Sequence, residues 1–302
     1  MNWDVILDTL EAKGISPYLR RIIADYLRER KLRVEGTEYE ITAGVPQGSI
    51  LGPTLWNLAY DGVLEVPMPE GVRSVAYADD LALVVTARNE TALEDRANEA
   101  LENVAEWISR HHLKLAPEKT EAILLIGKKR LRRELDIQLE GHPVTPSKEV
   151  KYLGVRLDQG MTGSAHVKYA TRKAAKAVAS LSRLMPRTGG AGEGRRRLLA
   201  TVADSIVLYA APAWEKAMKS KTNRKILRST QRVLALRICR AYRTVSTNAA
   251  LVLARTIPWD IAARERAERH EDPMLSLEEA KEITLGRWQQ EWRSAGERQP
   301  GD

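Results

Sequence analysis

Apolar positions along the first 45 residues follow helical spacing first and strand spacing afterwards. The apolar residues of Leu19–Leu27 recur at helical spacing after Ser16-Pro17, a pair typical of a helix start, so we expect two helices within the first thirty residues. Apolar and polar positions then alternate over Arg33–Val45, around Glu35-Gly36-Thr37, which predicts a short hairpin.

Strand and helix patterns stay interleaved up to residue 158. Apolar strands are expected over Arg73–Tyr77 and Leu81–Thr86, on either side of a turn that carries two aspartates. An amphipathic helix is expected over Leu93–Ile108, and further strands over Ala122–Ile126 and Val150–Leu157. Interleaved hairpins and helices are typical of the α+β class.

Only helical patterns follow Gly160. The apolar stripes that predict three helices comprise Val167, Ala170, Ala174, Val178, Leu181 and Leu184; Leu198, Leu199, Val202, Ile206 and Tyr209; and Ile226, Leu227, Val233, Leu234 and Ile238. We therefore expect a boundary near Asp158–Ser164 and three regions, namely a mixed region over 1–158, a basic helical region over 165–245 and a C-terminal helical extension over 246–302.

The formal net charge of +8 is concentrated in one segment. Ala165–Val245 holds 19 Lys or Arg against three acids, a net charge of +16. Basic residues that served only solubility would be spread along the chain, so this concentration favours a face that binds nucleic acid.

Composition disfavours several other classes of protein. Apolar runs such as Ile206–Ala213 are much shorter than the roughly 20 residues of a membrane-spanning helix. Cys239 is the only cysteine, which excludes an internal disulfide and a multi-cysteine zinc site. Because no basic and apolar leader follows Met1, we expect an intracellular protein, in the nucleus, the cytoplasm or both, with no membrane partner.

The most informative chemical pattern is Tyr77-Ala78-Asp79-Asp80, between the two expected strands. Adjacent aspartates are a weak sign of function by themselves, because Asp is a favoured turn residue. Three further blocks accompany them in order: Gly44–Pro53 (GVPQGSILGP) upstream, and Leu113–Thr120 (LKLAPEKT) and Tyr152–Val155 (YLGV) downstream.

In this order the four blocks resemble motifs B, C, D and E of the reverse transcriptases of non-LTR, LINE-type retrotransposons, over about residues 1–158. The helical remainder, with SIVLYAAPAW at Ser205–Trp214, is similar to the thumb and C-terminal region of arthropod elements of this type. The resemblance implies an RNA-directed DNA polymerase with a partial right-hand palm, an all-α thumb and C-terminal helices. The partners that it implies are an RNA template, a DNA primer and deoxynucleoside triphosphates.

By the same resemblance, Asp79 and Asp80 would hold two Mg²⁺ ions, for which Mn²⁺ can substitute. Lys119 would protonate the leaving pyrophosphate, although a solvated surface lysine is an equal alternative.

Other motif residues would contact the substrates. Nucleotide and template would lie against Pro46, Gln47, Gly48 and Tyr77, and the primer grip would comprise Tyr152, Leu153 and Gly154. A capped helix start at the first block, and a strand tyrosine packed for area at Tyr77, stay open as alternatives. Backbone phosphates would contact basic residues on exposed helix faces: Lys168, Arg172, Lys176, Arg195, Arg196, Lys221, Arg224 and Arg228.

One carboxylate of the family has no counterpart in this sequence. A right-hand polymerase needs a third aspartate on the motif-A strand, and Asn2-Trp3-Asp4 resembles the helix start that follows that strand. We therefore expect that this strand, most of the fingers and any endonuclease region are missing, and that the chain alone is inactive. The rival interpretations are a non-catalytic nucleic-acid-binding relic or domesticated protein, and a purely structural interaction protein.

Overall fold

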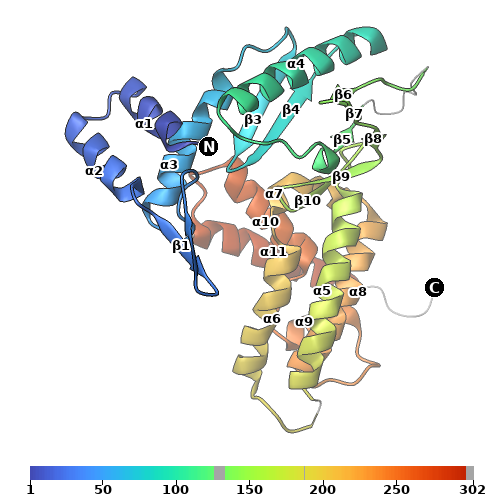
Figure 1. The fold of residues 1–302 in the computed structure, drawn as a ribbon. Coiled ribbons are helices and arrows are strands. Elements are labelled where there is room, and N and C mark those ends of the chain that lie inside the picture. Colours follow the sequence, from blue (N-terminus) through green and yellow to red (C-terminus); the bar gives the residue numbers. More distant parts are fainter. Residues whose placement is uncertain (126–132, 187, 297–302) are drawn as a thin grey trace. The chain divides into compact units, whose positions relative to one another are not determined.

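The computed structural model describes residues 1–125, 133–186 and 188–296, and it divides the chain into two compact units (Figure 1). The first unit consists of Met1–Ala122 and Arg130–Pro146, and the second of Ile123–Lys129 and Ser147–Asp302. The boundary expected near Asp158–Ser164 therefore falls inside the second unit. The reason is that the last strand packs on the helix that follows it.

The first unit interleaves helices with short antiparallel hairpins. Its helices are α1 (Trp3–Ala12), α2 (Pro17–Leu27), α3 (Leu51–Tyr60) and α4 (Glu90–Arg110), with 3-10 turns at Asp61–Glu65 and Pro117–Lys119. Its paired strands are β1 (Lys31–Val34) with β2 (Thr37–Glu40), β3 (Val72–Tyr77) with β4 (Asp80–Val85), and β6 (Gln138–Leu139) with β7 (His142–Pro143).

Local signals account for these helix starts. The Ser16 side chain accepts a hydrogen bond from the Leu19 amide ahead of α2, and the Asn89 side chain accepts one from the Ala92 amide ahead of α4. The two early helices, the hairpin, the strands around the aspartate turn and the amphipathic helix are confirmed, which establishes the expected mixture of helices and small sheets. Of the strand expected over Ala122–Ile126, β5 covers Ala122–Ile123, and residue 126 lies outside the described residues.

One face of the β3/β4 hairpin is packed and the other is exposed. Ala76, Leu81 and Leu83 pack against a cluster that includes Val104 and Ile108 of α4. Strand residues on the opposite face, such as Val75 and Val84, are about half exposed. The hairpin is thus fixed from one side, and its turn projects beyond this core.

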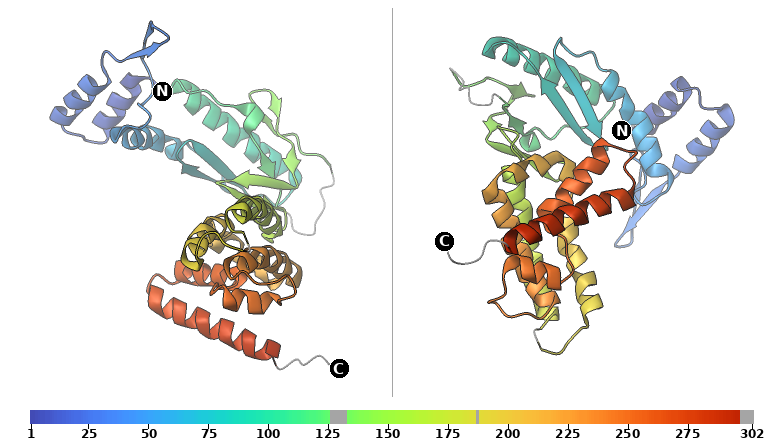
Figure 2. Two further views of the ribbon diagram at one scale, coloured as in Figure 1. Left: turned by 90° about the horizontal axis from the view of Figure 1, so that it is seen from below. Right: turned by 180° about the vertical axis from the view of Figure 1, so that it is seen from behind.

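The second unit is a helical bundle that begins with a β-hairpin. The hairpin pairs β9 (Glu149–Tyr152) with β10 (Val155–Asp158), and β8 (Pro146–Ser147) precedes it. The helices are α5 (Ser164–Leu184), α6 (Glu193–Val207), α7 (Ala211–Trp214), α8 (Lys221–Ile238), α9 (Thr247–Leu253), α10 (Trp259–Glu271) and α11 (Leu277–Gly296), with a 3-10 turn at Glu215–Lys219. α11 packs against α10 (Figure 2).

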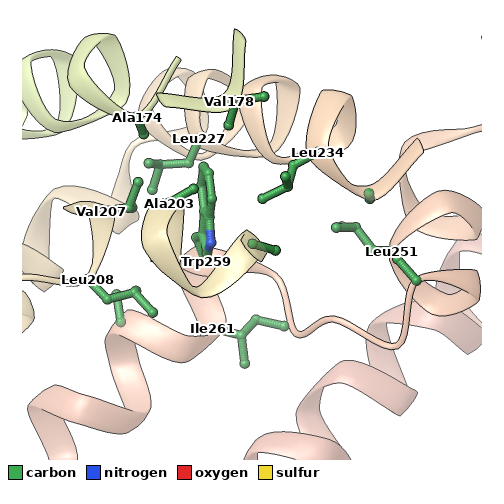
Figure 3. Packing of buried hydrophobic residues seen from close by; sticks show 14 of the residues in the cluster. Ala174, Val178, Ala203, Val207, Leu208, Leu227, Leu234, Leu251, Trp259 and Ile261 are labelled. Carbon is green, nitrogen blue, oxygen red and sulfur yellow. The ribbon is translucent and has the colours of Figure 1, made fainter. Parts of the chain in front are cut away.

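A single buried cluster joins these helices around Trp259 (Figure 3). The indole is 1% exposed and its Nε1 donates a 2.7 Å hydrogen bond to Asp204 Oδ1. Leu227 and Leu234 of α8 and Val178 of α5 belong to the same cluster. Burial of a tryptophan with its one donor satisfied stabilises a core without leaving an unpaired polar atom.

The face of α6 that packs inward differs from the expected one. Leu198 is 70% exposed and Val202 is 47% exposed, so these two positions of the expected stripe are wrong. Leu199 and Ile206 of the same stripe are half-buried and pack against the core cluster, as expected. The buried positions are Arg196, Ala200, Ala203 and Val207. The small residues Ala200 and Ala203 on this face let the backbone of α6 lie close to its neighbours, while Leu198 and Val202 face solvent. Across the described residues, no helix is both long and apolar enough for a membrane span.

Candidate functional site

The two candidate metal-binding carboxylates lie at the turn between β3 and β4 (Figure 1). Tyr77 pairs with Asp80 across the turn, and Ala78 adopts a left-handed conformation with φ of 55°. Asp79 and Asp80 are exposed, and neither side-chain carboxylate makes a hydrogen bond or ion pair with any described residue. Tyr77 beside them is 66% exposed, which argues against the alternative of a tyrosine packed for area.

Aromatic side chains of α3 and α4 support this turn from one side. Trp56 Nε1 donates a 3.0 Å hydrogen bond to the Ala78 carbonyl oxygen. The Trp56 ring stacks on Tyr60, with centroids 5.2 Å apart, and Tyr60 meets the edge of Trp107 at 5.9 Å. Burial, and then the charges of Asp79 and Asp80, raise the pKa of Tyr60.

Trp56 and Tyr60 are not among the site residues expected from the sequence. Their i, i+4 spacing on a helix indicates only a shared face, which is typical of any packed helix. The sequence does not indicate that this helix face contacts the carbonyl oxygen of Ala78.

The donor set at the turn suits a hard divalent cation. Mg²⁺ prefers carboxylate oxygens and keeps several waters, so exposed and unpaired aspartates are suitable partial ligand sets. In the part of the chain that the structure describes, no group of three or more His, Cys, Asp or Glu residues could hold a metal ion. Asp79 and Asp80 thus offer carboxylate oxygens of the type that Mg²⁺ prefers, but by themselves they would provide only part of its ligands.

The loop before α3 is fixed by its own hydrogen bonds. Ser49 Oγ donates to the Pro46 carbonyl oxygen at 2.8 Å and accepts from the Gly52 amide at 2.9 Å. A Cβ at Gly52 would lie 2.7 Å from the Pro46 carbonyl oxygen, so this position requires glycine. The capped helix start is thus present, while Gln47 and Gly48 remain exposed.

Lys119 is exposed at the end of the 3-10 turn Pro117–Lys119. Within the described residues, no hydrogen bond or ion pair joins Lys119 or Gln47 to Asp79 or Asp80. The structure therefore leaves both roles of the resemblance as predictions.

In the second unit, the expected primer-grip residues form the turn between β9 and β10. Leu153 and Gly154 have φ of 45° and 82°, and Tyr209 Oη donates a 2.9 Å hydrogen bond to the Leu153 carbonyl oxygen. A Cβ at Gly154 would lie 3.1 Å from the Tyr209 ring. Tyr209 thus covers the turn and fixes it. The contact is not expected from the sequence, although Tyr209 lies in the Ser205–Trp214 block that resembles the thumb region.

Six of the eight expected phosphate-contacting residues are exposed on the helices of the second unit. They are Lys168, Arg172, Lys176, Arg195, Lys221 and Arg224. Lys168 and Arg172 also line a cavity of about 410 Å³ beside the β9/β10 hairpin, together with Arg156, Glu149 and Asp158. Burial would raise the pKa of Asp158, but hydrogen bonds from Thr162 and Ala165 outweigh it and lower that pKa. Asp158 therefore stays ionised and accepts a hydrogen bond from the amide of Ala165 in the first turn of α5.

The expected exposure of Arg196 is wrong. Its side chain is fully buried, and its guanidinium donates to the carbonyl oxygens of Ala191, Arg237, Pro186 and Gly189 at 2.6–2.9 Å. A guanidinium with these donors engaged cannot reach a phosphate without unfolding the loop around it.

The expected exposure of Arg228 is also wrong. Its side chain is 17% exposed and forms salt bridges to Asp260 of α10 and Glu291 of α11. Two carboxylates compensate its charge, so Arg228 holds three helices together rather than attracting a polyanion.

Comparison with known proteins decides the family. A family model described as reverse transcriptase (RNA-dependent DNA polymerase) matches residues 1–157, the stretch that contains all four motif blocks. The chain belongs to the reverse transcriptase family.

Three relatives of this chain belong to insect retrotransposons. A Pol polyprotein of the type-1 element R1 2 of Nasonia vitripennis is 34% identical over 232 residues, which cover 74% of this chain and 56% of that protein. The R1 polyprotein of Bradysia coprophila is 30% identical over 75% of this chain and 23% of its own length. The RNA-directed DNA polymerase of the mobile element jockey of Drosophila melanogaster is 27% identical over 69% of this chain and 24% of its own length.

These matches extend beyond residue 157, because they cover about three quarters of the chain. The chain spans between about a quarter and two thirds of the curated relatives it matches. No solved structure matches the chain.

Proposed function

We propose that this chain forms the palm and thumb portions of an RNA-directed DNA polymerase of a non-LTR retrotransposon, which joins deoxynucleotides to a primer 3′-hydroxyl on an RNA template. The observation that carries the proposal is the Asp79-Asp80 turn. Two exposed and unpaired carboxylates lie on a hairpin that is packed on one face, inside the stretch that matches the family.

In this mechanism the β3/β4 hairpin holds the negatively charged side chains of Asp79 and Asp80 in place. Bound Mg²⁺ ions would supply positive charge that stabilises the oxygens on which negative charge develops during nucleotide transfer. Asp79 and Asp80 would hold these ions from the hairpin side, with Tyr77 beside the primer terminus. Lys119 would donate a proton to the leaving pyrophosphate, and Gln47 and Gly48 would lie under the nucleotide and template.

The second unit would bind the primer–template through its phosphates. Its exposed cations lie on α5, α6 and α8, and the fixed turn at Leu153-Gly154 would contact the primer strand. With few aromatic or amide side chains among the cations, such a surface has no evident means to distinguish bases.

The two carboxylates lie on one turn, and a clamp around two ions needs oxygen ligands on the facing side as well. We therefore propose that this 302-residue chain does not synthesise DNA by itself and acts together with a segment that supplies the facing carboxylate. The basic second unit keeps a non-catalytic nucleic-acid-binding role as the second candidate function, since its cations do not depend on a metal site.

Primer extension on an RNA template tests the proposal. The chain alone should incorporate no nucleotide with Mg²⁺ or Mn²⁺, whereas a chimera in which it replaces the matching segment of an R1 relative should extend the primer. A chimera that folds and binds primer–template but shows no incorporation would overturn the polymerase assignment and favour the binding role. Incorporation by the chain alone would overturn the need for a facing carboxylate.

A further inference from the structure

The residue between Tyr77 and Asp79 has a backbone conformation that needs support. Ala78 is left-handed, with φ of 55°. For a residue with a Cβ, this conformation is less stable than the right-handed one, because Cβ lies too close to the backbone carbonyl oxygen. The turn that presents both carboxylates therefore tends to relax unless a contact holds it.

Trp56 provides that contact. Its indole nitrogen donates to the carbonyl oxygen of Ala78 itself, at 3.0 Å, and the indole has no second donor that could be used elsewhere. The bond joins the middle of α3 to the middle of the turn. It therefore restrains the peptide group that immediately precedes Asp79.

The indole is itself held in place. Trp56 stacks on Tyr60 with an interplanar angle of 18°, Tyr60 is buried, and Tyr60 meets Trp107 of α4 at an angle of 77°. Stacked and edge-on pairs of this kind add specific stabilisation to the burial of area. A chain of three rings thus connects α4 to the turn through one hydrogen bond.

We infer that Trp56 is a positioning residue for Asp79 and Asp80, and that its indole N–H holds the carboxylate turn in the conformation that binds a divalent cation. The inference rests on the proposed function. Trp56 touches no reacting atom, so its effect should be seen in cation affinity, before any nucleotide is added.

Mn²⁺ binding to the intact chain, followed by electron paramagnetic resonance, tests this inference. The Mn²⁺ binding that belongs to the carboxylate turn is the part of the signal that Asp79→Asn removes. Trp56→Phe keeps the stacked ring but removes the N–H, and should weaken this binding about three- to ten-fold, the effect expected for one net hydrogen bond. Trp107→Phe changes the same aromatic group without removing a bond to the turn, and should leave the affinity within about two-fold.

Replacement of Ala78 by glycine separates positioning from general destabilisation. Glycine adopts a left-handed conformation at little cost, so the turn should persist without the indole bond. Trp56→Phe should therefore weaken Mn²⁺ binding much less in an Ala78→Gly background than in the native one, even if Trp56→Phe lowers thermal stability equally in both backgrounds.

The possible outcomes separate failure of the positioning role of Trp56 from failure of the proposed metal-binding role of Asp79 and Asp80. If Asp79→Asn removes no Mn²⁺ binding, the metal role of the turn fails, and the positioning role fails with it. If Asp79→Asn removes binding but Trp56→Phe does not weaken it, only the positioning role is overturned. An equal loss of affinity in the native and the Ala78→Gly backgrounds would show that Trp56 acts on the fold as a whole, which also overturns it.

Discussion

Arg195 and Arg196 are neighbours on α6 with opposite environments, and their exchange for methionine provides a matched test of the second unit. Arg195 is exposed, whereas Arg196 is fully buried and donates to four carbonyl oxygens. Burial, followed by the charges of Arg240 and Arg237, lowers the pKa of Arg196, but a guanidinium in a protein remains protonated.

The size of the effect follows from these contacts. A hydrogen bond from a charged donor contributes about 1.5–3 kcal/mol, and the four bonds of one side chain are not additive. Since the acceptors at Pro186 and Gly189 belong to exposed residues and can be rehydrated, we expect Arg196→Met to cost about 3–5 kcal/mol of unfolding free energy. The melting temperature should fall by about 10 °C, since each kcal/mol shifts it by roughly 2–4 °C in a unit of this size.

Each variant should lose one property and keep the other: Arg196→Met should lose stability, and Arg195→Met should lose affinity for duplex. In thermal melts followed by circular dichroism, Arg196→Met should be strongly destabilised and Arg195→Met should melt as the native chain does. In duplex binding below the melting temperature, Arg195→Met should bind more weakly and Arg196→Met should bind normally. Equal melting temperatures for the two variants, or weaker binding by a folded Arg196→Met chain, would refute the reasoning.

Three further outcomes are expected. The affinity for duplex should fall as the salt concentration rises, with a slope of about −4 or steeper in a plot of log affinity against log salt, since each phosphate contact contributes about −0.9. Binding should show little sequence preference, and an affinity that does not change with salt would contradict binding through the phosphate backbone. Tyr209→Phe should destabilise the second unit by about 0.5–1.5 kcal/mol through loss of its bond to Leu153, as measured by urea unfolding, and an unchanged midpoint would contradict that contact. Burial lowers the pKa of His166 below 6.5, so the stability that depends on the neutral ring should be complete above pH 6.5 and decline as the pH falls below it. The melting temperature should therefore fall less between about pH 7.5 and about pH 5.5 in His166→Asn than in the native chain. An identical fall in the two proteins would count against His166 as the origin.

Periodic burial explains why much of the fold could be predicted from the sequence. The stripe of α5 is confirmed at Val167, Ala174 and Val178, and the aspartate turn lies between the expected strands. These signals are strong because burial of apolar area drives the placement of helices and strands.

The errors have a common physical origin. The sequence pattern favours large apolar residues for the inner face of α6, but the close packing of this helix uses Ala200 and Ala203 and places Arg196 at the same spacing. Basic residues are usually solvated, and only the three-dimensional arrangement shows that carbonyl oxygens from two other segments surround Arg196. The bonds from Trp56 to Ala78 and from Tyr209 to Leu153 join residues 22 and 56 positions apart, which spacing along a helix cannot reveal.

The most direct test of the central claim is primer extension by the chimera that carries this chain, with Asp79→Asn compared with Asp95→Asn. Asp95 is an exposed acid on α4 and serves as the matched control. Asp79→Asn should reduce incorporation by at least about 100-fold, the loss typical of removing one charge-stabilising group, while primer–template binding stays intact and Asp95→Asn extends normally. Incorporation by Asp79→Asn at the level of the Asp95→Asn control would contradict the assignment of this turn as the site of nucleotide addition.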